Sequence, residues 1–239
     1  MKMLRIFLFV LSAGFAWADA PGPTPWPMPA PDFFLARIPS PPSAGSALDR
    51  ADLDYTVALQ AAATPAEIAH AVKTSGFTVF TFSEVLGPDF TPEKYPQTAA
   101  FFARVIATSN SVKNTLKDHF RRLRPVDGHK DVVRELVPYE AGFSYPSGHS
   151  TRSWLSALVL GRLDPAERSA LLLSAAQVGL DRVIEGMHYQ SDVVNSRALS
   201  EVIFTQLLDN PEFVKELDAL KAAEWASLPQ PVQAAPATP

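Results

Sequence analysis

The sequence predicts an all-α fold, a single-domain helical bundle. Apolar residues recur at helical spacing over most of residues 48–226, and no run alternates apolar with polar residues as a strand does. The motif Thr64-Pro65-Ala66-Glu67 combines a capping box with proline at the first helical position, and Asp164-Pro165-Ala166-Glu167 repeats it. At 239 residues, 47% of them apolar, the chain can bury one sizeable core, and its composition does not require a second domain.

Residues 1–18 have the layout of a secretory signal peptide. Two positive charges precede a short apolar run, which ends in small residues around Ala18. Cleavage after Ala18 is preferred to cleavage after Ala20, which would leave Pro21 directly behind the bond. The alternative is an uncleaved membrane anchor. No other stretch approaches the roughly 20 apolar residues of a spanning helix, so we expect a periplasmic or secreted chain with no membrane span once processed.

The remaining elements follow from proline, glycine and capping signals. Residues 19–47 are proline-rich and predict an extended arm ahead of the helical domain at 48–226, and a Pro/Ala-rich tail at 227–239 is expected to be flexible. Arg124-Pro125 interrupts the helical pattern, and Gly186 can supply a left-handed helix end. Helices are expected over 49–62, from Pro65, over 97–119, from Ser147-Gly148, over 164–185, over 189–208 and over 211–226.

Charge and cysteine content exclude several classes of protein. The formal net charge is −4. It becomes −6 if the signal peptide is cleaved, because Lys2 and Arg5 are lost with it. A chain this acidic is not expected to bind nucleic acid or anionic membranes through net charge. Because the chain has no cysteine, disulfides, thiol catalysis and cysteine-ligated metals are excluded.

Three separated stretches carry groups that suit phosphoryl transfer, which needs fixed cations, backbone N–H donors, a nucleophile and a proton donor. Ser147 is a strong N-cap, and a helix N-terminus binds anions readily. His188 and Asp192 are four residues apart and share a helix face. Taken singly, the stretch that ends at Arg124-Pro125 could be a solvated basic turn. The stretch around Ser147 could be an ordinary capped helix start, and His188 with Asp192 could be a structural pair. The stretches run from Lys117 to Arg124-Pro125, over Pro146-Ser147-Gly148-His149, and from Arg182 through His188 to Asp192.

Their order and spacing resemble the three-part signature of the type 2 phosphatidic acid phosphatase superfamily. The match is most similar to the bacterial class A non-specific acid phosphatases, which are exported, soluble and all-helical. This resemblance covers roughly residues 38–208 and implies metal-independent, broad-specificity hydrolysis of phosphomonoesters. Small-molecule phosphate esters are then the expected partners, and no cofactor is expected. The sequence leaves the oligomeric state open, a homo-oligomer included.

The resemblance also implies roles for individual residues. His188 would be the nucleophile that forms a phosphohistidine, oriented by Asp192, and His149 would be the proton donor and then the base. Phosphate binding would fall to Lys117, Arg124, Ser147, Gly148 and Arg182. No metal site is expected, and the other histidines, His70, His119 and His129, are interpreted as structural or surface residues.

One position departs from the signature. The family has serine immediately before the third-part arginine, whereas this chain has Asp181. An ionised carboxylate there would repel a phosphate dianion unless it clamps Arg182 or turns away from the pocket. A phosphate-binding protein with weakened catalysis is therefore one alternative. Others are a soluble lipid or diphosphate phosphatase and a vanadium-dependent haloperoxidase, which shares this anion pocket.

Overall fold

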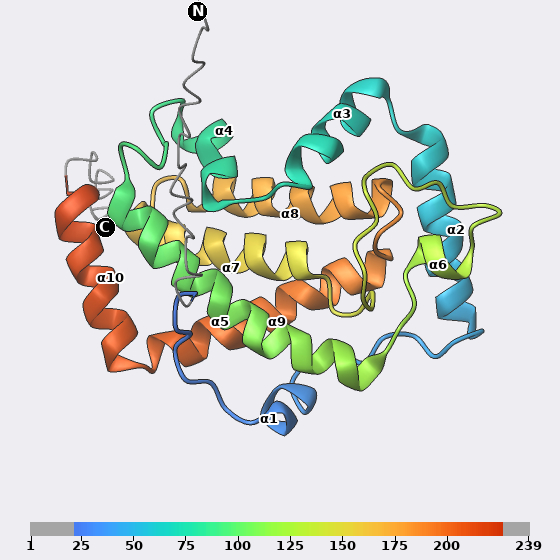
Figure 1. Ribbon diagram of the computed structural model, residues 1–239, viewed down its shortest axis with the longest axis horizontal. Coiled ribbons are helices and arrows are strands. Elements are labelled where there is room, and N and C mark those ends of the chain that lie inside the picture. The colour runs from blue at the N-terminus through green and yellow to red at the C-terminus, as the bar shows by residue number, and fades with distance from the viewer. Residues whose placement is uncertain (1–21, 227–239) are drawn as a thin grey trace, which may run out of the picture.

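The computed structural model describes residues 22–226, and they are helical with no strand (Figure 1). The expected all-α class is confirmed. The predicted signal peptide and the tail at 227–239 lie outside the described residues. The elements are α1 (Pro31–Leu35), α2 (Ala47–Ala62), α3 (Pro65–Thr74), the 3-10 helix η1 (Val79–Phe82), α4 (Ser83–Leu86), α5 (Pro96–Phe120), α6 (Pro125–Gly128), α7 (Gly148–Leu163), α8 (Arg168–Ile184), α9 (Gln190–Leu208) and α10 (Pro211–Glu224).

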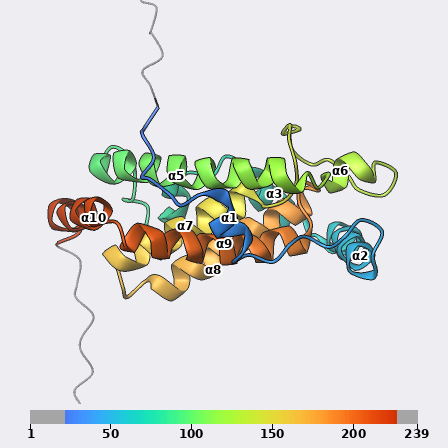
Figure 2. The ribbon, with the colours of Figure 1, turned by 90° about the horizontal axis from the view of Figure 1, so that it is seen from below.

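Helix α7 is the centre of the bundle. It packs against α5, α8 and α9, which surround it in both views (Figures 1 and 2). Side chains are buried on most of its faces, among them Leu155, Leu158 and Leu160. A helix that is buried on most of its faces is a core helix, so the residues at its N-terminus are carried into the interior of the protein.

The proline-rich arm lies on the helical domain. Trp26 is buried, its backbone N–H donates to Thr108 Oγ1 at 3.0 Å, and its ring packs against Phe101 and Phe213. Phe34, on α1, is also buried. These aromatic contacts join the arm to α5 and α10.

Most helix boundaries agree with the sequence, and one expectation is wrong. Thr64 forms the predicted capping box with Glu67, and α5 spans the predicted long helix. The start of α8 was expected at Asp164-Pro165, but α8 begins at Arg168. Asp164 instead follows the last turn of α7, where its backbone N–H donates to Leu160 and its carboxylate accepts from Ala166 N–H at 3.2 Å.

Helix α2 buries a polar face rather than an apolar one. Its buried residues are Asp52, Thr56 and Gln60. The amide of Gln60 donates to the carbonyl of Ile184 at 2.8 Å, and Asp52 accepts from Arg122 at 2.9 Å. The helix is therefore held by hydrogen bonds to the segments that carry the candidate site.

Gly186 makes the sharp turn between α8 and α9. Its φ is +78°, in the left-handed region that favours glycine, and an added Cβ would lie 2.6 Å from the carbonyl oxygen of Arg134. The turn lets the backbone N–H of His188 donate to the carbonyl of Arg182 at 3.2 Å. It thus brings two candidate residues together from opposite sides of the turn.

Candidate active site

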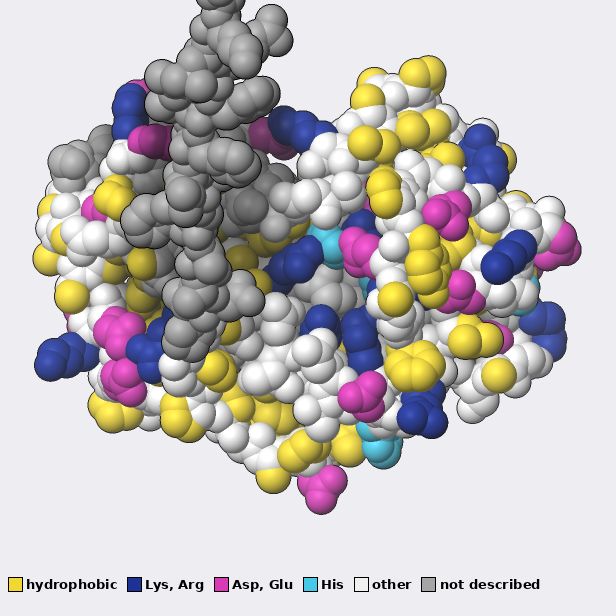
Figure 3. Space-filling view, viewed as in Figure 1, with side chains coloured by type: hydrophobic (Ala, Val, Ile, Leu, Met, Phe, Trp, Pro, Cys, Tyr) yellow, Lys and Arg dark blue, Asp and Glu magenta, His cyan; other side chains and the backbone are white. Residues whose placement is uncertain are grey.

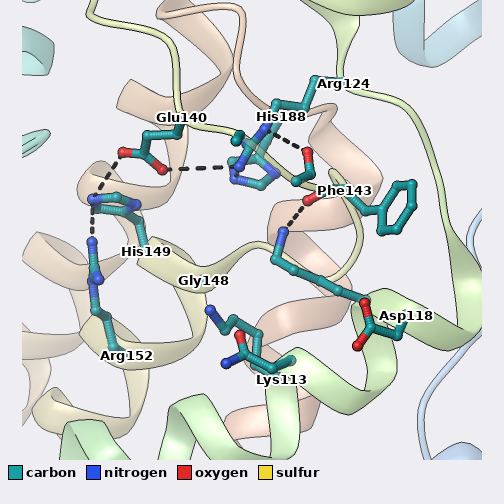
Figure 4. A pocket seen from close by; sticks show the side chains of 13 residues that line it. Lys113, Asp118, Arg124, Glu140, Phe143, Gly148, His149, Arg152 and His188 are labelled. Atoms are coloured by element: carbon teal, nitrogen blue, oxygen red, sulfur yellow. Dashed lines mark hydrogen bonds and ion pairs between the residues drawn. The ribbon is translucent and has the colours of Figure 1, made fainter.

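A cavity of about 410 Å³ opens where α5, the N-terminus of α7 and the turn before α9 meet. Figure 3 shows Lys and Arg side chains gathered with a histidine in a hollow of the surface, and Figure 4 shows the lining side chains from close by. Its lining residues are Lys113, Asn114, Lys117, Asp118, Arg124, Glu140, Ala141, Gly142, Phe143, Gly148, His149, Arg152 and His188.

His188 presents one ring nitrogen to the cavity side and the other to a hydrogen-bond relay. Nε2 lies 3.1 Å from Nη1 of Arg124, a donor, so this nitrogen carries a lone pair. Nδ1 lies 3.3 Å from Ser144 Oγ. Burial, together with the nearby cations Arg124 and Lys117, holds the pKa of His188 well below its usual value. The imidazole is therefore neutral, as a nucleophile requires.

Asp192 is linked to His188 through Ser144, a serine that the sequence did not point to. Oδ2 of Asp192 is 3.8 Å from Nδ1 of His188, too far for a hydrogen bond, but it accepts from Ser144 Oγ at 2.5 Å. The carboxylate also accepts from Arg122 at 2.7 Å and from Tyr189 N–H at 3.0 Å. These bonds fix the carboxylate, and Ser144 connects it to the imidazole.

His149 is buried at the first turn of α7. Its Nε2 lies 2.8 Å from the carbonyl oxygen of Ser75, is in contact with Nη2 of Arg152 and lies 4.0 Å from Oε1 of Glu140. Burial and then the charges of Arg182 and Arg152 hold the pKa of His149 well below its usual value. Protonation of this imidazole is therefore favoured only at low pH or beside a bound anion.

The three cations expected to bind phosphate converge on the same region. Lys117 donates to the carbonyl of Phe143 and lines the cavity beside Arg124. Burial, with the like charges of Arg124 and Lys113, lowers the pKa of Lys117 to about 6. Arg182 lies behind the cavity wall, fully buried. Its guanidinium nitrogens are paired with the carboxylates of Glu140 and Glu185, and within residues 22–226 they make no aligned hydrogen bond.

The other two expected phosphate ligands differ in position. Gly148 lines the cavity at the N-terminus of α7. Ser147 is buried just before it: its hydroxyl accepts from Ser150 N–H at 3.3 Å, and its own N–H donates to Ser196 Oγ at 2.7 Å. The Ser147 backbone is therefore already satisfied, whereas Gly148 faces the space where an anion would sit.

Asp181 points away from the cavity. Its carboxylate accepts from Thr74 Oγ1 at 2.6 Å and from Gln177 at 2.9 Å, and it lies 3.0 Å from Nδ1 of His70. Of the two arrangements expected for it, the structure has the one turned toward α3. Arg182 pairs instead with two other carboxylates, Glu140 and the buried Glu185, and burial raises the pKa of Glu185 to about 8.

Glu140 lies among the anion-binding groups, and the sequence analysis did not identify it. Its carboxylate is 3.9 Å from Nη2 of Arg124 and 4.0 Å from Nε2 of His149 (Figure 4), and it is 3.1 Å from Nη2 of the buried Arg182. No spacing rule links it to them, because it lies on a loop. A carboxylate in contact with two arginines and a histidine occupies the position suited to a substrate anion.

Two further cations line the cavity that were not predicted. Lys113 lies one turn before Lys117 on α5, and Arg152 lies one turn after Gly148 on α7. Their helical spacing from predicted residues was the signal that could have found them. Of the remaining histidines, His70 pairs with Asp181 and Glu84, as the structural interpretation expects.

Comparisons with known proteins identify the family. Residues 98–210 match the model of the PAP2 superfamily. Over 207 residues, 81% of each chain, the protein is 30% identical to a non-specific acid phosphatase of Providencia stuartii. It is also 34% identical over 98 residues to a lipid A 1-phosphatase of Rhizobium etli, covering 40% of this chain and 42% of that one.

A solved structure of the first transmembrane PAP2-type phosphatidylglycerolphosphate phosphatase from Bacillus subtilis aligns with a TM-score of 0.48 and 22% identity, over 74% of this chain and 88% of its own. None of the helices in residues 22–226 has the length and apolar character to cross a membrane. The extent of the acid phosphatase match confirms the family expected from the motifs. This chain belongs to the PAP2 superfamily, as a relative of its bacterial non-specific acid phosphatases.

Proposed function

We propose that this protein is a broad-specificity acid phosphatase that hydrolyses phosphomonoesters through a phosphohistidine, without a metal ion. The enzyme class, acid phosphatase, follows from the family. The observation that carries the mechanism is the neutral, buried His188, whose Nε2 lone pair lies beside Arg124. A nucleophile held next to a fixed cation can approach a negatively charged phosphoryl group.

In the first step, the Nε2 lone pair of His188 attacks phosphorus and forms a P–N bond. The P–O bond to the ester oxygen breaks, and protonated His149 gives its proton to that oxygen as it leaves. In the second step, His149 removes a proton from water, the resulting hydroxide attacks phosphorus, and the P–N bond breaks to release phosphate. His149 ends protonated and His188 neutral, so the cycle balances.

Arg124, Arg182 and Lys117 supply positive charge to the phosphoryl oxygens in both steps. Arg182 is paired with Glu140 and Glu185 without an aligned hydrogen bond, and a phosphoryl oxyanion would supply one. Three fixed cations provide the charge that a metal ion supplies elsewhere, which supports metal independence. The lowered pKa of His149 supports acid conditions, because its protonated form is the proton donor.

The relay through Ser144 would keep His188 in the reactive tautomer. If Asp192 accepts from the Ser144 hydroxyl, then Ser144 Oγ accepts from Nδ1–H of His188, and Nε2 keeps its lone pair. This arrangement also stabilises the positive charge that the ring gains when Nε2 bonds to phosphorus.

The surroundings of Asp181 argue against the weakened binding protein. Its carboxylate is engaged by Thr74, Gln177 and His70, so it does not face the phosphate region. A second candidate is a phosphatase of lipid headgroups, favoured by the likeness to the lipid A 1-phosphatase. Export to the periplasm or the medium remains part of the proposal and rests on the predicted signal peptide.

The direct test replaces the nucleophile. The His188→Ala variant should lose turnover of 4-nitrophenyl phosphate by at least about 1,000-fold, since covalent catalysis has no other group there. Its far-UV circular dichroism should equal that of the parent protein. Replacement of the surface histidine, His129→Ala, is the matched control and should retain activity. Undiminished turnover by a folded His188→Ala protein would refute the assignment.

A further inference from the structure

The cavity holds more positive charge than one phosphoryl group uses. Lys117 and Arg124 line the cavity, with Arg182 buried behind it, and are the cations proposed to bind the phosphoryl group, yet Lys113 and Arg152 also line the cavity. Burial lowers the pKa of Lys113 and lowers that of Arg152 to about 10, because partial removal from water disfavours the charged form of each side chain. Charges kept partly buried in a cavity mark a binding function.

The fold sets the position of these two cations on the His149 side of the cavity. The side chain of Lys113 runs along Gly148, where a Cβ would lie 3.0 Å from Lys113 Cδ. Arg152 is in contact with Nε2 of His149. Figure 4 shows both side chains toward α5 and α7, away from Arg124. Attack by His188 in line with the departing bond places the leaving oxygen on this same side, next to His149.

Both side chains have unused hydrogen-bonding capacity. Within residues 22–226 the ammonium of Lys113 has no hydrogen-bond or ion-pair partner, and Nε of Arg152 is buried without one. The acidic residues on the lining are Asp118 and Glu140, and neither forms an ion pair with Lys113 or Arg152 in the described chain. Lys113 therefore presents an unpaired ammonium on the cavity lining, and Arg152 keeps donors that its contact with His149 does not use.

The contact between Arg152 and His149 is in conflict with the proton donor role. An Nε2 that carries hydrogen can donate to the carbonyl of Ser75, but it cannot also accept from Arg152. A negatively charged group on the substrate would draw Arg152 to itself and leave His149 free to be protonated. A negative charge on the substrate would thus favour the protonated form of His149, the proposed proton donor.

We propose that Lys113 and Arg152 form a leaving-group subsite for a second anionic group, so that the preferred substrates are phosphate esters or anhydrides whose leaving group is itself negatively charged. This inference rests on the proposed phosphatase function and specifies its substrate class. Inorganic pyrophosphate is the smallest such substrate. The His188–phosphorus bond forms, the bridging P–O bond breaks, and the departing phosphate receives its proton from His149.

The test compares two aryl phosphates that differ in one charge, 3-carboxyphenyl phosphate and 3-carbamoylphenyl phosphate, with pyrophosphate as a third substrate. The native enzyme should show a kcat/KM for the carboxylate at least about tenfold above that for the amide, the effect of one or two charge-assisted hydrogen bonds. Lys113→Met and Arg152→Met should each reduce this ratio by about fivefold or more.

Matched controls replace exposed cations elsewhere, Lys215→Met on α10 and Arg162→Met at the far end of α7, and should leave the ratio unchanged. Arg152→Lys keeps the charge and should restore most of the preference. Turnover of the amide substrate by the native enzyme tests the phosphatase function separately. If the amide is hydrolysed but the ratio is near one, or is unchanged in the folded Lys113 and Arg152 variants, the subsite does not exist.

Discussion

Glu140 shows how a single side chain can set the affinity of the whole site. Its carboxylate contacts Arg182 and Arg124 and faces His149, although the side chain is 42% exposed. A substrate phosphate seeks the same donors, so it must displace this internal anion. We therefore expect Glu140 to lower the apparent affinity for phosphate.

Removing that competing charge should strengthen phosphate binding. We expect Glu140→Gln to lower the inhibition constant of inorganic phosphate by about two- to fivefold, the range for a partly exposed ion pair. Glu135→Gln, an exposed glutamate on the same loop, is the control. Steady-state inhibition assays measure both. Weaker phosphate binding by Glu140→Gln would mean that the carboxylate supports the site instead of competing for it.

At the scale of elements, Asp181 joins α8 to α3. Its buried carboxylate accepts from Thr74 and lies beside His70, both on α3, and accepts from Gln177 one turn earlier on α8. A buried carboxylate with three such partners stabilises the packing of two helices. The aspartate at a position where the family has serine thus has a structural explanation.

This explanation predicts that Asp181→Ser changes stability and leaves binding alone. The variant should lose about 1–3 kcal/mol of unfolding free energy, the cost of leaving buried donors unpaired, and so melt several degrees lower. Its phosphate inhibition constant should stay within about twofold of the parent value. Asp218→Ser, on the exposed face of α10, is the control. Markedly tighter phosphate binding in Asp181→Ser would place the carboxylate in the pocket after all.

The elements and the site differ in how far sequence can predict them. Capping and proline signals located α3, α5 and α10, because these are local effects within one turn. The start of α8 was misplaced because Asp164 completes the end of α7 with similar local bonds. Ser144 and Glu140 lie on a loop, where neither periodicity nor spacing constrains a side chain, so their place in the site is visible only in three dimensions.

For the whole molecule, an acidic chain encloses a strongly cationic cavity. The formal net charge is −4, yet four of the cavity-lining residues are lysine or arginine. Burial, and then repulsion from Arg124 and Lys113, lowers the pKa of Lys117 to about 6, so this cation loses its proton as the pH rises above that value. Anion affinity should therefore decrease as the pH rises.

Sulfate provides the measurement, because its own charge stays constant between pH 5 and pH 8. Its inhibition constant should increase by about tenfold or more over that interval, as a proton linked to binding is lost. In Lys117→Met the inhibition constant of sulfate should increase much less between pH 5 and pH 8. A flat profile for the native enzyme would show that Lys117 keeps its proton throughout.

The most direct test of the central claim is to trap the phosphorylated enzyme. The His149→Ala variant lacks the base for the second step, and 4-nitrophenolate leaves without a proton, so the intermediate should accumulate with 4-nitrophenyl phosphate. After an alkaline quench, peptide mass spectrometry should find the phosphoryl group on His188. A burst of nitrophenol with His188 unmodified, or with the label on another residue, would contradict the account.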